Sequence, residues 1–588
     1  MDNAVIASSL DDAKKLTKKF GIQYSDIYLW KPDFSEYKSL KNHNIFYLGE
    51  SIENNLLDEA EIEFHKILKN WYQDVDGNDL SFYKNCSLGL TFQSSLEIVF
   101  YNLVLSYITF TELSKKYKKI YINAGEDDVK TFAAQWINNN CNNRFEFLYH
   151  KNKKSLKQKV HYMVGFRDLN FQFRGSIIDS ILAKILFFVQ LPFKKTKNIC
   201  ITNAGKFDEY IQISNKSRSL DYRLLLPLNR KFRSFLGSLF FWQRINSSYN
   251  QNASVEIIKK LNTNKNNITS SVVPNELYKK AIEVFLYPYF SKAISYYEYY
   301  LKIFKFFDTS LAIYGTDGVE RFILSAYAAK KSNIPTAYMP HGIAFWSNHS
   351  MVNDSNRAFD YYLSLGNFDS TKYQKLGLNI ADIRDICIPW FAKSNFKVRS
   401  KKKKNNVCAL LLPLDPGYSL KINAKTIVDH LHDMIEVCNQ LNIEIIGVKF
   451  READNLAEFG FSNGKNLIKN QHINVFGGYG EISKYFSEVD MVIGPPSSAL
   501  VETFLAEKKF YAFQDLSCYR HNPNISYELI SEYIDCASNK TELIENINMN
   551  NIFKENSNID SIINSKKTLE EAFKITESTF NSLTKKSK

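Results

Sequence analysis

Apolar and polar positions alternate along the chain in a pattern that predicts strands interleaved with helices. Short apolar runs bounded by polar residues are typical of buried strands. They occur at residues 26–30, 44–49, 119–125, 310–314, 334–339, 359–366, 407–413, 443–450, 473–476, 489–492 and 510–513. Longer stretches predict helices at residues 57–71, 95–117, 277–307, 319–331 and 425–441, whereas the Asn-, Ser- and Lys-rich residues 246–269 predict a loop. Such alternation indicates parallel sheets and an α/β fold.

The length of the chain predicts more than one domain. At 588 residues it exceeds what one hydrophobic core usually supports. We expect a second parallel sheet to start near residue 350. Residues 145–270 carry no clear pattern, although basic and aromatic residues interleave at 230–242. Such a run suits either a helix packed into a core or contact with a bilayer interface.

The net charge indicates which classes of partner the chain suits, and the cysteines indicate the redox state of its compartment. The net charge of +13, from 75 basic and 62 acidic residues, suits anionic partners such as membrane lipid, nucleotide donors or acidic glycans. No nucleic-acid-binding motif is present, so we expect no nucleic-acid partner. The eight cysteines form no Cys-x-x-Cys pair, which favours reduced thiols over a disulfide framework or a zinc site.

The start of the chain lacks a signal peptide, and the longest apolar run, 181–193, is too short to span a bilayer. We expect a cytoplasmic protein, with contact at the inner-membrane surface left open.

One turn stands out in the C-terminal half. The predicted strand at 489–492 is followed by a turn with Gly494 and two prolines, then by Ser497 and Ser498, and then by a predicted helix that carries Glu502. A serine at a helix start caps backbone N–H groups, and such a start attracts anions. The two serines are therefore candidates to bind a phosphate, with Glu502 one turn further along to bind a ribose. The alternative is a capped strand–helix turn without function.

Polar residues also follow three predicted strands in the N-terminal half. Asp317 and His341 follow the strands at 310–314 and 334–339, which we expect to be neighbours in one sheet. Glu126 follows the strand at 119–125. Carboxyl ends of parallel strands meet at one edge, where ligands bind. A helix cap or a favourable helix-dipole contact would explain single carboxylates equally well.

Taken together, these short motifs resemble the GT-B glycosyltransferases, over roughly residues 310–515 by the strand–helix alternation. The CMP-sugar enzymes of that group, the bacterial sialyltransferases and Kdo transferases, carry an acidic-acidic-Gly motif, a His-Pro motif and a Ser/Thr pair. This chain has Thr316-Asp317-Gly318, His341-Gly342 and Ser497-Ser498 in the same order. Thr316 and Gly342 depart from the pattern, which leaves the identity of the donor open.

The resemblance implies an α/β, GT-B-like fold with two Rossmann-like domains that face a central cleft. Residues 1–345 would form the acceptor-side domain, with a helical insertion near 145–305. Residues 346–540 would bind the nucleotide sugar, and residues 541–588 would form a helical tail. Because no Asp-x-Asp motif lies in a convincing loop, we expect catalysis without a metal and without a cofactor beyond the nucleotide-sugar co-substrate.

The resemblance also implies roles for the candidate residues. Gly494, Ser497, Ser498 and Glu502 would bind the donor. His341 would contact its phosphate or carboxylate, and Asp317 would act as general base or as nucleophile. Glu126 would add a second carboxylate from the same face.

The expected activity is transfer of a sugar, Kdo or sialic-acid-like and CMP-linked, onto a bacterial capsule, O-antigen or lipooligosaccharide glycan. The partners would be a nucleotide-sugar donor and a glycan or lipid-linked glycan acceptor. Alternatives are a transferase that uses a UDP-sugar or CDP-glycerol, a sugar 2-epimerase, and a non-catalytic glycan- or membrane-binding assembly protein.

Overall fold

A computed structural model of the chain describes most of it. The described residues are 2–32, 34, 43–50, 52–124, 129–140, 144–149, 197–202, 222–225, 247–263, 268–307, 309–315, 320–340, 357–387, 407–414, 419–450, 464–468, 471–477, 482–519, 529–554, 557–564 and 568–585. Asp317, His341 and Glu126 lie outside them, as do the basic and aromatic residues at 230–242.

The first sheet, called the N-terminal sheet here, is entirely parallel. Its strands lie in the order β3-β2-β1-β6-β7. Their bounds are β1 (Asn3–Ala7), β2 (Asp26–Leu29), β3 (Asn44–Tyr47), β6 (Lys119–Ala124) and β7 (Phe145–Tyr149). The strands predicted at residues 26–30, 44–49 and 119–125 are therefore confirmed. After β1, helix α1 (Leu10–Phe20) begins at its cap Ser9.

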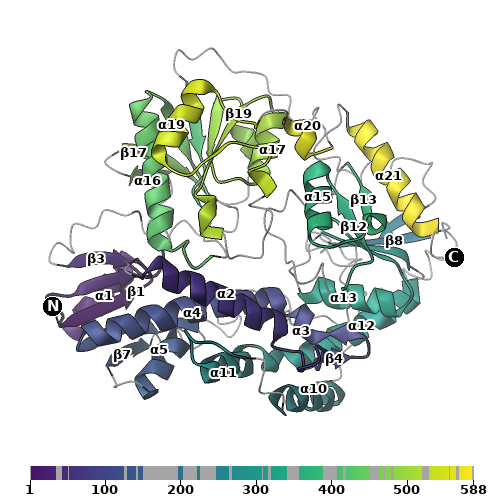
Figure 1. The fold of residues 1–588 in the computed structure, drawn as a ribbon, viewed down its shortest axis with the longest axis horizontal. Coiled ribbons are helices and arrows are strands. Elements are labelled where there is room, and N and C mark those ends of the chain that lie inside the picture. Colours follow the sequence, from purple (N-terminus) through teal and green to yellow (C-terminus); the bar gives the residue numbers. More distant parts are fainter. Residues whose placement is uncertain are drawn as a thin grey trace, which may run out of the picture.

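Two long helices lead away from this sheet. They are α2 (Asn54–Asn70) and α4 (Gln93–Lys116), which confirm the predicted helices, and β4 (Phe82–Tyr83), β5 (Cys86–Ser87) and α3 (Leu88–Thr91) lie between them. Among the described residues, α4 alone is long and apolar enough to cross a membrane, but 61% of its most apolar window is buried inside the protein. It packs against α2 and against α5 (Val129–Asn140). In Figure 1, α2 and α4 run between the N-terminal sheet on the left and a second sheet on the right.

That second sheet, the middle sheet, has the order β13-β12-β11-β10-β8-β9 and is also parallel throughout. Its strands are β8 (Lys197–Thr202), β9 (Tyr222–Leu225), β10 (Thr309–Tyr314), β11 (Thr336–Tyr338), β12 (Tyr361–Ser364) and β13 (Ile383–Asp385). The expectation that a second sheet starts near residue 350 is wrong, because β12 pairs with β11. The middle sheet thus holds strands from both sides of residue 345.

The region between β7 and β10 is not purely helical, contrary to the predicted insertion, since β8 and β9 join the middle sheet. The loop predicted at residues 246–269 is largely a helix, α10 (Ser247–Thr263). Its buried Ile257 and Leu261 are one turn apart and sit in the core, which outweighs the polar composition. The helix predicted at 277–307 is broken at Pro288 into α11 (Asn275–Phe285), the short η7 (Tyr287–Tyr289) and α12 (Phe290–Phe307).

The third sheet, the C-terminal sheet, has the order β16-β17-β15-β14-β18-β19-β20. All its pairs are parallel except β16 with β17. The strands are β14 (Cys408–Leu411), β15 (Glu444–Lys449), β16 (Gly464–Ile468), β17 (Gln471–Phe476), β18 (Met491–Gly494), β19 (Lys509–Phe513) and β20 (Cys536–Ala537). The strands predicted here are confirmed, as is the predicted helix at 425–441, which is α16 (Ala424–Gln440).

The other described helices pack on the sheets or follow them along the chain. They are α13 (Glu320–Lys331), α15 (Asn367–Lys375), α17 (Ser498–Leu505), α19 (Lys540–Met549), α20 (Ile559–Ile562) and α21 (Leu569–Lys585), with the 3-10 turns η8 (Ile380–Asp382), η12 (Ile482–Tyr485) and η13 (Leu516–Tyr519). After the C-terminal sheet the chain returns to the middle sheet (Figure 1). The Asn564 amide donates to Leu365 O over 2.6 Å, and the Thr576 hydroxyl donates to Cys387 O over 2.6 Å. These two hydrogen bonds attach the segment from α20 to α21 to the middle sheet.

Two large cores hold these layers together, and the middle sheet belongs to both. On β10, Ala312 and Tyr314 belong to a core shared with α2 and α4. The alternating residues Leu311 and Ile313 belong to a core shared with the C-terminal sheet. Successive side chains of a strand point to opposite faces, so one strand serves both cores. The predicted α/β class is confirmed, but the described residues form three largely parallel sheets rather than the two expected.

Candidate functional site

The strand order of the C-terminal sheet has a switch point, and such a point is where an open α/β sheet forms a ligand crevice. Numbered along the chain, its parallel strands lie in the order 3-2-1-4-5-6, so that β14 is strand one and β18 is strand four. Chain connections run in opposite directions from these two strands. In open α/β sheets, ligands bind outside the carboxyl ends of the strands at such a switch point. The carboxyl ends of β14 and β18 are therefore where a ligand is expected.

Gly494 ends β18 at this crevice, and the packing there requires a glycine. A Cβ atom on Gly494 would lie 2.6 Å from Leu412 Cβ and 2.7 Å from Leu412 O. The Leu412 amide donates to Ile493 O over 2.8 Å, which draws the two chains together just beyond the paired strands. The absence of a side chain at Gly494 thus lets the chain after β14 pass directly beside the turn after β18.

The turn after Gly494 ends in a capped helix. Ser497 has extended backbone angles and its hydroxyl accepts from the Ala499 amide over 3.3 Å, so it is the N-cap of α17 and Ser498 is the first helical residue. The first turn of α17 contains no acidic residue. Because a helix start carries partial positive charge, this one suits an anion.

Glu502 lies one turn into α17 and is 8% exposed. The structure thus brings together all four predicted donor-binding residues on one turn and the helix that follows it. Their role in donor binding stays a prediction.

Lys449 is a charged residue at the same edge that the sequence analysis missed. It ends β15 and is 8% exposed, and its ammonium donates to Phe450 O over 2.6 Å. Leu411 pairs with Val448 on one side and with Ile493 on the other, so Lys449 lies level with Leu412 and Gly494. Lysines are rarely buried. In the sequence, the one sign of this residue is a lysine at the end of a largely apolar predicted strand.

The middle sheet brings together the strands that precede two of the predicted catalytic residues. β10 and β11 pair side by side in parallel, and the Met339 amide donates to Tyr314 O over 2.8 Å just beyond the strand ends. The chain thus leaves neighbouring strands at one edge toward Asp317 and toward His341, as the sequence predicted. The two side chains lie outside the described residues. In chain order this sheet reads 2-1-3-4-5-6, which puts its switch point between β8 and β10.

The strand before Glu126 belongs to a different sheet from the strand before Asp317, and the role of Glu126 stays a prediction. We expected it to share a face with Asp317, but the preceding strand β6 belongs to the N-terminal sheet and β10 to the middle sheet. Glu126 therefore does not follow a strand of the sheet that leads to Asp317. The pattern of one strand cannot tell which of two similar sheets it joins.

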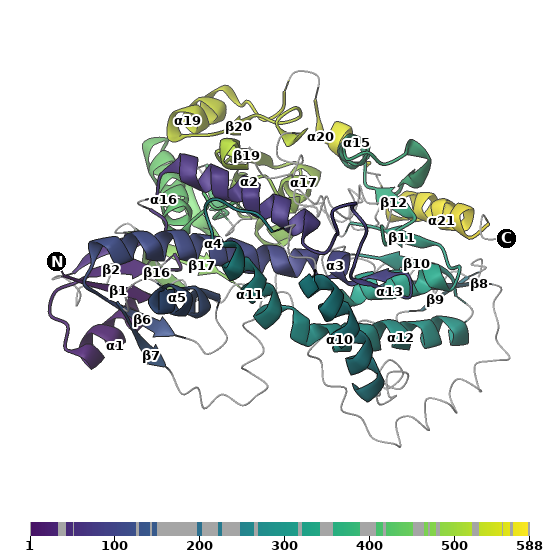
Figure 2. The ribbon, with the colours of Figure 1, turned by 60° about the horizontal axis from the view of Figure 1, so that its bottom comes forward.

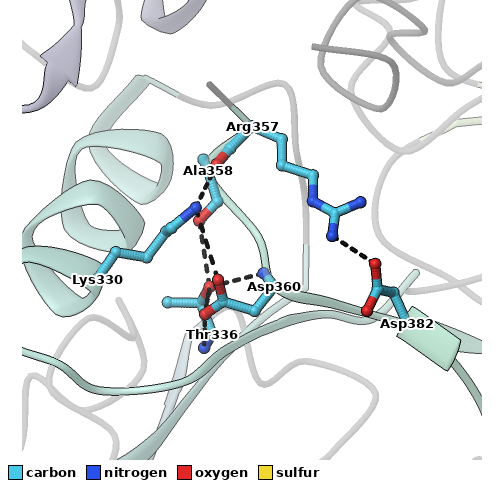
Figure 3. A network of polar contacts seen from close by, with 6 residues as sticks. All are labelled: Lys330, Thr336, Arg357, Ala358, Asp360 and Asp382. Atoms are coloured by element: carbon cyan, nitrogen blue, oxygen red, sulfur yellow. Dashed lines mark hydrogen bonds and ion pairs between the residues drawn. The ribbon is translucent and has the colours of Figure 1, made fainter. Parts of the chain in front are cut away.

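A cluster of charges on the middle sheet lies at the edge away from these strand ends. Figure 3 shows Asp360 joined to Thr336, and Arg357 joined to Asp382. Asp360 accepts from the Thr336 amide and hydroxyl, each over 2.9 Å, at the amino ends of β11 and β12. Lys330 ties the end of α13 to this cluster through Arg357 O over 2.8 Å. These contacts satisfy strand and helix ends, so the cluster is structural.

The described residues offer no site for a metal ion. There, no group of three or more His, Cys, Asp or Glu side chains is arranged to hold a metal ion. The metal-free catalysis expected from the sequence stays a prediction, as do the cytoplasmic location and the contact with the inner membrane.

The chain is similar to known proteins in structure only, and the similarity is distant. No family model matches the chain, and no curated protein matches it. A UDP-GlcNAc 2-epimerase from Neisseria meningitidis bound to UDP-GlcNAc is similar at 9% identity and a TM-score of 0.39, over 66% of this chain and 100% of that one. A glycosyltransferase from Rickettsia africae is similar at 13% identity and a TM-score of 0.35, over 67% of this chain and 97% of that one. A protein from Anabaena in complex with UDP and glucose shows 14% identity and a TM-score of 0.35, over 66% of this chain and 100% of that one. Likenesses this weak carry no argument about activity, so the site rests on the chain's own sheets.

Proposed function

We propose that this chain is a nucleotide-sugar-dependent glycosyltransferase that extends a bacterial surface glycan. The observation that carries the proposal is the turn from Gly494 to Ser498, which opens a helix free of acidic residues in its first turn at the switch point of a Rossmann-ordered sheet. A nucleotide phosphate is the anion that such a site suits. Release of the nucleotide with its phosphate is the step that a fixed helix dipole would favour.

The proposed acceptor side is the middle sheet. Two polar residues, Asp317 and His341, follow adjacent strand ends there, and a carboxylate is a group that can accept the proton of an acceptor hydroxyl. We assign Asp317 as general base or nucleophile and His341 to the donor phosphate or carboxylate. The favoured donor is a CMP-linked Kdo or sialic-acid-like sugar, from the motif order given above.

A thermal-shift screen against CMP, UDP and CDP tests the donor. A ligand at one hundred times its Kd stabilises a protein by about 2.7 kcal/mol, which raises the Tm by several degrees. We expect CMP to give the largest shift. A shift with UDP alone would replace the CMP donor by a UDP-sugar, a shift with CDP alone would favour CDP-glycerol, and no shift with any of the three would reject a nucleotide site.

A genetic test separates an enzyme from a non-catalytic assembly protein. The variants Asp317→Ala and His341→Ala are introduced at the native locus, and surface polysaccharide is measured together with the protein level. We expect polysaccharide to be lost at a normal protein level. Unchanged polysaccharide in both variants would favour the assembly protein.

A further inference from the structure

The segment between β14 and α16 docks on helices that belong to the N-terminal part of the chain. This segment, residues 419–423, is called the strap here. Leu420 of the strap is fully buried in the core that α2 and α4 share, whereas Ile422 belongs to the core of the C-terminal sheet. In Figure 1 the lower end of α16 lies above α2, and Figure 2 shows α2 running above α4. The strap therefore joins two packed cores.

One carboxyl group organises the polar contacts of the strap. Glu61 of α2 is 0% exposed, and its Oε2 accepts from the Ser419 hydroxyl over 3.0 Å and from the Leu420 amide over 3.3 Å. The Ser419 hydroxyl also lies 2.6 Å from Cys518 O, in the loop after β19. A single hydroxyl hydrogen cannot serve both acceptors at once. A protonated Glu61 relieves this conflict, because its own O–H can donate to the Ser419 oxygen while Ser419 donates to Cys518 O.

The other groups that face Glu61 do not neutralise it. Within the described part of the chain, Glu61 Oε1 and His65 Nε2 lie 4.0 Å apart and neither has a hydrogen-bond partner. Lys421 of the strap pairs with Asp58 over 2.5 Å and is thereby occupied. The Tyr101 hydroxyl of α4 donates to Ile422 O over 3.0 Å.

Burial then sets the protonation of these groups. It raises the pKa of Glu61 to about 8, against the smaller opposing effects of Ser419, Leu420 and Lys421. It lowers the pKa of His65 to about 3, so the imidazole stays neutral. It also raises the pKa of Tyr101 and of the Cys518 thiol, so both stay neutral over the same range. Glu61 is thus the group among them that changes charge between mildly acidic and mildly alkaline pH.

We propose that the strap is a proton-dependent latch, which stays docked on α2 while Glu61 is protonated and is released when Glu61 gives its proton to water. The sign follows from linkage. The docked state holds a proton that an exposed glutamate, with a pKa of 4.5, gives up. Docking is therefore strongest below that value and weakens as pH rises toward about 8, by about tenfold for each pH unit between the two values.

Hydrogen–deuterium exchange of the strap tests this latch in the full-length protein without ligand. Protection factors, corrected for the intrinsic pH dependence of exchange, are measured for the Leu420 and Ile422 amides from about pH 6 to about pH 8. We expect protection to fall roughly a hundredfold over this range in the native protein. In Glu61→Gln, which keeps the shape and carries no ionisable group, protection should not change with pH.

Glu59→Gln is the matched control, because Glu59 lies on the same helix and is exposed. It should keep the native pH profile. A Glu61→Gln profile equal to the native one would overturn the proposal, as would a native protection that does not change with pH. If Glu61→Gln does not fold, Lys421→Met takes its place. Loss of the Lys421 charge removes an interaction that lowers the pKa of Glu61, so protection should go on falling to a higher pH than in the native protein. An unchanged profile would reject the latch.

Discussion

Two turns in this protein share one local design, and only one of them is suited to an anion. In the N-terminal sheet, β1 is followed by Ser8 and Ser9, and Ser9 caps α1 by accepting from the Asp12 amide. In the C-terminal sheet, β18 is followed by a turn in which Ser497 caps α17. Each strand also borders a switch point, between β1 and β6 or between β14 and β18.

The difference lies in the first helical turn. Helix α1 carries Asp11 and Asp12 there, and Lys15 pairs with Asp11 over 2.6 Å. Its own carboxylates already satisfy the helix dipole and repel a further anion. Helix α17 has no acidic residue in its first turn. A serine cap at a strand end is thus not enough to indicate a phosphate site, and the charge of the second and third residues after the cap is what separates the two turns.

The largest effect is expected from Gly494→Ala. The added methyl would lie 2.6 Å from Leu412 Cβ, and overpacking of this kind costs about 1–3 kcal/mol. We expect a lower free energy of unfolding in urea and loss of the nucleotide-induced rise in Tm. The control is Gly21→Ala after α1, where a Cβ meets no atom within 4 Å but φ is +64°. It should lose about 1 kcal/mol through backbone strain and keep the nucleotide response. A normal response in Gly494→Ala would mean that the close approach to Leu412 is not needed for binding.

The paired variants Ser497→Ala and Ser9→Ala compare the two caps directly. Removal of a serine cap costs about 1 kcal/mol in either helix. Urea unfolding should therefore show similar losses, whereas the nucleotide-induced rise in Tm should shrink in Ser497→Ala alone. An equal reduction in both variants would place the nucleotide at neither turn.

The smallest effect on stability, and the sharpest on binding, is expected from Ala499→Asp. This change gives α17 an acidic residue at the position that Asp11 holds in α1. A carboxylate near a helix start stabilises it by about 0.3–1 kcal/mol, so unfolding in urea should change little. Nucleotide affinity, measured by calorimetric titration, should nevertheless fall at least tenfold. Ala499→Asn, without the charge, should retain most of the affinity; equal losses in both would show that shape rather than charge is responsible.

Local patterns predicted the candidate donor turn well and the sheets only in part. Gly494, Ser497 and the helix after them are a short-range signal, because the cap and the turn are made by neighbours in sequence. Strand β12 was recognised as a strand, but nothing local says that it pairs with β11 rather than opening a new sheet. Helix α10 was predicted as a loop because most of its residues are polar. Its buried residues Ile257 and Leu261 are too few to dominate the composition.

Contacts distant in sequence escaped the sequence analysis altogether. Lys449 is a candidate because it lies level with Gly494 at the same edge of the sheet. Strand order decides this, and strand order is not a local property of the sequence. Glu61 looks like an ordinary helical glutamate until Ser419, more than three hundred residues later, covers it. Burial of this kind is decided by tertiary packing, which single-sequence patterns do not contain.

The return of the C-terminal helix to the middle sheet has a consequence for biosynthesis. Phe573 and Phe580 of α21 lie in the same core as Leu311 and Ile313 of β10, and the helix packs directly on that strand. The ribosome delivers β10 long before α21, so this face of the middle sheet keeps apolar side chains exposed until α21 emerges. A chain that lacks α21 would leave that face uncovered and would be prone to aggregate.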